Sequence, residues 1–207
     1  MRKAMLAALL MLLCVLSLFS EAMEFSGGKT TVSMKQGSRH VVLTGGAKVS
    51  TDDVQLSADT MELYGEDYSY VLCSGNVSAT DKSNGISFTS PDLFYDRALG
   101  KVSSDSWIEI QDTGNQAALS GGWFEYDMES SVMKLQLMAK IVKVTDEGLM
   151  VCRADIIEYD GEKESVSLRG NASVTWNGDV YKAAVITVDL SNDSISMFGT
   201  VSGEFND

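Results

Sequence analysis

The chain has 207 residues, of which 44% are hydrophobic, enough for one domain with a large core. Its formal net charge of −13 disfavours contact with phosphate backbones, so we expect no nucleic-acid partner. With one histidine and three widely spaced cysteines, the sequence contains no zinc-ligand motif, nucleophile elbow or phosphate-binding loop. We therefore expect no catalytic residue, no metal and no cofactor.

The first 22 residues have the pattern of an export signal. Arg2 and Lys3 precede an apolar run over residues 4–19, and Ser20 and Ala22 are the small residues that signal peptidase reads. The apolar run is short for a membrane span. We therefore expect cleavage after Ala22, with retention of residues 4–20 as a membrane anchor as the alternative.

After the signal, apolar and polar residues alternate. Val41, Leu43 and Val49 share one phase near the start, and Leu168 and Val174 share it near the end. A period of two predicts strands with one buried face. Turn signals such as Asn-Gly and Asp-Gly separate the runs. We therefore predict about eleven to thirteen short antiparallel strands and no helix after the signal.

A repeat of about 30 residues runs through the chain, which is typical of stacked supersecondary units. A small residue, usually Gly, begins the strands at 45–49, 75–79 and 170–174, and an Ala-Asp pair begins the elements at 58–63 and 154–160. We expect the aligned position to form a ladder along one wall. Its members are Leu63, Tyr95, Tyr126, Tyr159 and Val188.

Two groups of reactive side chains are interpreted as structural. Cys73 and Cys152 lie about two and a half repeats apart, so we expect buried free thiols despite export. Asp155, Glu158 and Asp160 have the spacing of paired carboxylates. They alternate along a predicted strand, and we interpret them as solvated groups at strand ends.

The order of these motifs resembles the OstA-like (LptA) family of periplasmic lipopolysaccharide-transport bridge proteins. The matching segments are residues 42–49, 56–63, 75–77 and 153–159. The resemblance implies an all-β fold, a twisted open β-jellyroll of stacked antiparallel strands. It divides the chain into a signal peptide (1–22), a leader (23–37), the jellyroll domain (38–203) and a tail (204–207). Residues 102–144 fit the motif poorly, which leaves their strand register open.

The resemblance also implies a function and partners. The protein would carry lipopolysaccharide or a related glycolipid through the periplasm from the inner to the outer membrane, with the acyl chains in an apolar groove. The jellyrolls would associate end to end, and their strand edges would pair with inner- and outer-membrane transport components.

The inward phase of the alternation supplies the candidate residues of the lipid groove. They are Leu43, Val49, Leu56, Met61, Leu63, Val77, Phe88, Leu93, Ile108, Ile110, Phe124, Ile157, Leu168, Val174 and Ile186. Any of them could instead be sealed core. Two other functions stay open: an LptC-like protein anchored in the inner membrane, and a secreted structural β-solenoid or adhesin with a sealed core.

Overall fold

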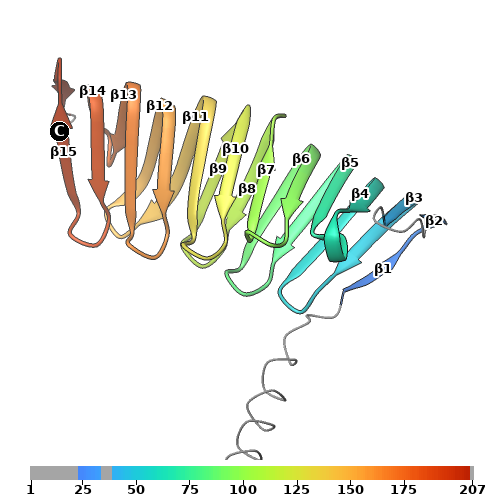
Figure 1. Cartoon of the computed structure of the whole chain (residues 1–207). Helices are drawn as coiled ribbons and strands as arrows, with labels where there is room; N and C mark the ends of the chain where they lie inside the picture. Colours follow the sequence, from blue (N-terminus) through green and yellow to red (C-terminus); the bar gives the residue numbers. More distant parts are fainter. Residues whose placement is uncertain (1–22, 34–38, 206–207) are drawn as a thin grey trace, which may run out of the picture.

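The computed structural model describes residues 23–33 and 39–205, and the expected signal peptide lies outside this part of the chain. The fold is a twisted β-jellyroll in which all strands belong to one antiparallel sheet (Figure 1). We expected no helix after the signal, and the described residues contain one short helical element, a 3-10 turn at Glu66–Tyr68. The strands are β1 (Glu24–Ser26), β2 (Lys29–Ser33), β3 (His40–Ser50), β4 (Val54–Tyr64), β5 (Tyr70–Asp81), β6 (Ile86–Asp96), β7 (Lys101–Ser104), β8 (Ile108–Asp112), β9 (Ala117–Gly121), β10 (Trp123–Asp127), β11 (Val132–Thr145), β12 (Gly148–Asp160), β13 (Ser165–Trp176), β14 (Asp179–Asp189), β15 (Ser194–Phe198) and β16 (Ser202–Glu204).

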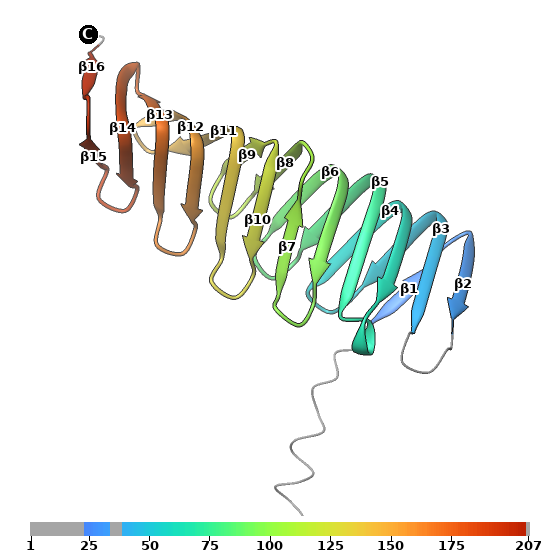
Figure 2. The same cartoon turned by 45° about the horizontal axis from the view of Figure 1, so that its top comes forward.

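Short strands in this sheet are halves of longer, bent strands. β1 and β2 both pair with β3, β7 and β8 with β6, β9 and β10 with β11, and β15 and β16 with β14. When each such pair counts as one strand, the sixteen become twelve, within the predicted range. These strands follow one another in chain order, from β1 and β2 at one end to β15 and β16 at the other (Figure 2).

Each long strand bends near its middle, and the repeated glycines lie at the bends. The prediction that they begin strands was therefore wrong. The backbone φ angle is positive at Gly45 (75°), Gly75 (77°) and Gly170 (74°), a region that favours glycine. The strand register shifts at all three positions, as in a β-bulge. The bends form a corner along the stack, and the half-strands on either side of it form two walls.

We call these walls A and B. Wall A contains residues 24–26, 47–50, 54–58, 77–81, 86–90, 108–112, 117–121, 139–145, 148–154, 172–176, 179–183 and 202–204. Wall B contains residues 29–33, 40–44, 60–64, 70–74, 92–96, 101–104, 123–127, 132–136, 156–160, 165–169, 185–189 and 194–198.

The Gly-Asn and Ala-Asp motifs meet at this corner. The Asn171 side-chain amide donates to Asp155 Oδ2 over 2.9 Å, and Asn76 makes the same bond to Asp59 over 2.8 Å. A Cβ atom added at Gly170 would overlap the Asp155 carboxylate. The repeat in the sequence is therefore a corner motif, in which glycine supplies the bend and the Asn–Asp bond joins neighbouring strands.

The middle segment has a corner that the glycine pattern did not reveal. In β11 the register shifts after Gln136, and Leu137 and Met138 take positive φ angles of 61° and 62°. Their side chains are 65% and 81% exposed. The buried phase of Met133 and Leu135 therefore skips Leu137 and resumes at Ala139 and Ile141, because a bulge of two residues leaves the alternation in phase.

The sheet begins earlier in the chain than the resemblance implied. β1 and β2 lie inside the segment 23–37 assigned to a leader, and both pair with β3. Their residues are exposed, so no buried face marks them as strands in the sequence. At the other end, β16 extends to Glu204, the first residue of the expected tail.

Gly170→Ala tests the corner motif. We expect it to lower the free energy of unfolding by about 1–2 kcal/mol, since an alanine at positive φ is strained and its Cβ displaces Asp155. Urea unfolding measures the change. Gly114→Ala is the control, because its Cβ would have ordinary contacts. Equal stability of the two variants would contradict the assignment.

Candidate functional site

The two walls enclose one continuous apolar interior. All fifteen candidate groove residues face it, and each is at most 3% exposed. They come from both walls: Leu56, Val77 and Val174 from wall A, for example, and Met61 and Ile157 from wall B. The structure therefore brings all fifteen into one cluster along the stack. Their contact with lipid stays a prediction.

The predicted ladder is a column of registered side chains in wall B. Leu63 pairs with Val71 and through it with Tyr95, while Met133 lies between Tyr126 and Tyr159. Val166 continues the column to Val188. No ladder residue is more than 6% exposed.

Side chains of the two walls interdigitate inside. The ring of Phe88 in wall A lies 5.4 Å from Phe124 and 5.6 Å from Tyr126 in wall B, measured between centroids. The middle segment adds buried residues that the prediction omitted, among them Leu119, Leu135 and Ile141. Leu135 and Ile141 lie six residues apart on the same phase of the alternation, and that unbroken phase is the signal that would have placed both.

The turns at the free ends of the half-strands form two rows, which meet opposite the corner in the central part of the stack. We call this meeting line the mouth. The Tyr126 hydroxyl of wall B donates to Asp81 Oδ2 of wall A over 3.0 Å, and Tyr159 donates to Asp112 Oδ2 over 3.3 Å. Burial, followed by the adjacent carboxylate, raises the pKa of both phenols. The phenols therefore remain protonated donors at neutral pH.

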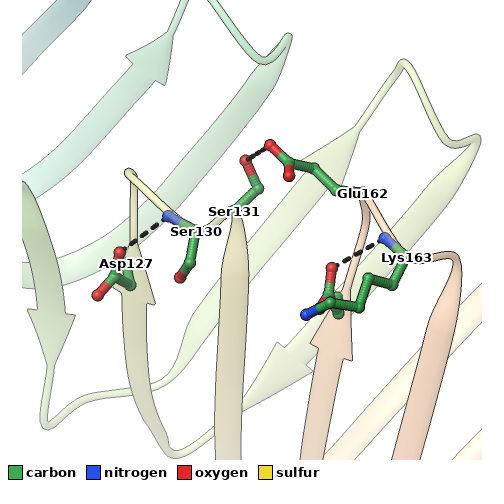
Figure 3. A network of polar contacts seen from close by, with 6 residues as sticks. Asp127, Ser130, Ser131, Glu162 and Lys163 are labelled. Atoms are coloured by element: carbon green, nitrogen blue, oxygen red, sulfur yellow. Dashed lines mark hydrogen bonds and ion pairs between the residues drawn. The ribbon is translucent and has the colours of Figure 1, made fainter.

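Aspartates begin the turns of both rows, and Figure 3 shows the local partners at two turns of wall B. Asp127 accepts from the Ser130 backbone amide over 3.1 Å, and this bond is the first cause of its lowered carboxyl pKa. Asp160 pairs with Lys163 Nζ at 2.7 Å. Asp155 lies at the corner instead. The structure thus separates Asp155 from Asp160 and gives each a structural partner. The interpretation of both as solvated groups at strand ends was wrong, because Asp155 lies in the middle of β12 and Asp160 is buried.

Comparison with known proteins gives the family. Over residues 26–194 the sequence matches the family described as LptA/(LptD N-terminal domain) LPS transport protein. The chain belongs to this family. Among solved structures it is similar to LptH of Pseudomonas aeruginosa, described as the LptA homologous periplasmic component of the lipopolysaccharide transport device. That likeness has 10% identity and a TM-score of 0.27, and covers 90% of this chain and 96% of the other. No curated protein matches the sequence.

In this member of the LptA/LptD family, both described cysteines are buried in the interior. Cys73 and Cys152 are free thiols, as predicted, and burial raises the pKa of each to about 12. Within residues 23–33 and 39–205, no helix has the length and apolarity to cross a membrane. The same part of the chain holds no group of three His, Cys, Asp or Glu side chains placed to bind a metal ion.

The buried thiols predict a loss of stability at alkaline pH. Above their ordinary pKa of 9.0, the unfolded chain releases the thiol protons while the folded chain keeps them up to about pH 12. The thiols therefore favour folding fully below pH 9, and this contribution falls as the pH rises. At pH 10 we expect a loss of about 1 kcal/mol per thiol. Urea unfolding at pH 8 and 10 measures it, and a Cys73→Ala/Cys152→Ala variant should lose less. An equal loss in that variant would contradict the prediction.

Proposed function

We propose that this chain is a periplasmic, non-catalytic carrier of lipopolysaccharide or a related glycolipid, moving it from the inner to the outer membrane. The observation that carries the proposal is the apolar interior, which extends without a break through the stack. Membership of an LPS transport family supports it. In this reading the acyl chains lie between the walls and the sugars remain in water.

The interior has the chemistry that acyl chains require. Its floor and sides are Leu, Ile, Val, Met and Phe side chains, and burial of each CH₂ group contributes about 0.8 kcal/mol. The stack presents these side chains at a regular strand spacing, so an acyl chain meets the same surface at every step. Transfer along the stack then needs no bond to be made or broken.

Lipid in the interior replaces contacts between the walls. Phe88 and Phe124 fill the space between them by direct ring contact, as in any close-packed core. Acyl chains would take over these contacts as the walls move apart. The fifteen candidate residues are then core in the empty protein and lipid contacts in the loaded one.

The two ends of the stack present the strand edges at which partners would bind. Among the described strands, β1 and β2 pair on one side with β3, and β15 and β16 pair on one side with β14. Unpaired strand edges accept further strands, and none of these four contains proline. The exposed side chains of Phe25 and Phe198 add apolar surface to both ends. We infer end-to-end self-association and edge pairing with transport components of both membranes.

Two alternatives have their own tests. An LptC-like anchored protein would retain residues 4–20, which lie outside the described residues, and N-terminal sequencing of the exported protein decides this. The close packing of the interior favours a structural β-stack with a sealed core. Such a protein would yield no lipid when it is extracted under native conditions and examined by mass spectrometry.

Photo-crosslinking tests the lipid path. p-Azidophenylalanine at Phe124, which is fully buried, should form an adduct with lipopolysaccharide in cells, since an acyl chain would lie against it. The same group at Trp107, which is 45% exposed, is the control and should form none. Mass spectrometry identifies the adduct. Its absence at Phe124, or its presence only at Trp107, would refute the interior path.

Sedimentation at increasing protein concentration tests the edges. Phe198→Lys places a charge on the last edge, where the native side chain is 77% exposed. We expect self-association to weaken about tenfold, because charged residues on an edge oppose strand addition. Leu99→Lys, at a 63% exposed position in a turn, is the control and should associate like the parent. Identical behaviour of both variants would exclude β15 from the contact.

A further inference from the structure

Backbone hydrogen bonds join the turns along each row. In wall A the Thr113 amide donates to Gly85 O over 3.2 Å, and in wall B the Met128 amide donates to Gly100 O over 2.9 Å. Both bonds connect neighbouring turns of one wall. Bonds of the same kind are Lys82 to Asp53 and Val144 to Gln116 in wall A, and Arg97 to Ser69 and Leu190 to Glu164 in wall B.

Side chains make the bonds that cross the mouth in the described part of the chain. Asp81 Oδ2 accepts from both Tyr126 OH (3.0 Å) and Asn84 Nδ2 (2.8 Å), and the Asn84 amide also donates to the Tyr126 oxygen (3.0 Å). One repeat further on, Asp112 Oδ2 accepts from Tyr159 (3.3 Å) and from Asn115 Nδ2 (2.8 Å). Asp81 and Asp112 are each 2% exposed, so water competes weakly for these bonds.

A small cavity of about 100 Å³ lies at the mouth beside these bonds. Its wall A side includes Asn84 and Asp112, and its wall B side includes Ser131 and Glu162. Ile86 and Met133 of the buried core also line it, so at this point a few polar side chains separate solvent from the apolar interior.

The corner cannot open in this way, because each strand crosses it as a continuous chain. Separation of the walls must therefore begin at the mouth. We propose that the Tyr126–Asp81 and Tyr159–Asp112 bonds are latches that hold the mouth closed, and that their release admits acyl chains to the interior. The admission of lipid rests on the proposed function, whereas the holding of the walls does not.

The ladder sets where the latches act. Of the ladder residues, Leu63 and Val188 towards the two ends lack a hydroxyl group, whereas Tyr95, Tyr126 and Tyr159 between them carry one. The two latches therefore hold the centre. Loss of both hydroxyls should increase the open fraction of the mouth about tenfold, since each bond makes a modest net contribution.

Chemical labelling of the buried thiols measures opening of the mouth, and this measurement requires no lipid. In a Cys14→Ser background of the full chain, we expect a maleimide to label Cys73 and Cys152 about tenfold faster in Tyr126→Phe/Tyr159→Phe than in the parent. This added labelling should be independent of low urea concentrations, as for local opening rather than global unfolding. Tyr181→Phe is the control, because its hydroxyl bonds Asp179 two residues away in the same strand.

Parent-like labelling of the double variant, or an increase that follows the urea dependence of global unfolding, overturns the latch proposal. If the double variant fails to fold, Tyr159→Phe alone decides by the same comparison. A second arm measures uptake of BODIPY-labelled lipopolysaccharide, which the double variant should load about tenfold faster. Failure of the parent to take up this probe counts against the proposed function, while the thiol result still decides the latches.

Discussion

The bend in every strand is the constraint on which the rest of the structure depends. A straight antiparallel sheet of this length would expose one apolar face to water along its whole area. Residues with positive φ at the centres of β3, β5, β11 and β13 turn the sheet back on itself at a shared corner, so that the apolar faces of the two halves cover each other. The interior, the corner and the mouth all follow from that one backbone feature.

Most of the architecture could be predicted from the sequence because it repeats. Alternation placed all fifteen candidate residues inside, and the spacing of Leu63, Tyr95, Tyr126, Tyr159 and Val188 predicted a real column. Local patterns of this kind depend on residues a few positions apart, which a sequence displays directly.

Three features were not predictable in the same way. The corner at Leu137 and Met138 has no glycine, so residue type gave no sign of its positive φ angles. The exposed strands β1 and β2 carry no buried face. The bond from Tyr126 to Asp81 joins residues 45 positions apart, and it depends on how far the two walls stand from each other.

The different bonding along the rows and across the mouth has a mechanical consequence. Pulling the molecule lengthwise loads the interstrand backbone ladders, many bonds at a time, so the stack resists stretching. Prying the walls apart loads a few side-chain bonds and the apolar contacts behind them. The molecule is therefore stiff along its axis and compliant across it. It can span a fixed distance while the separation of its two walls changes.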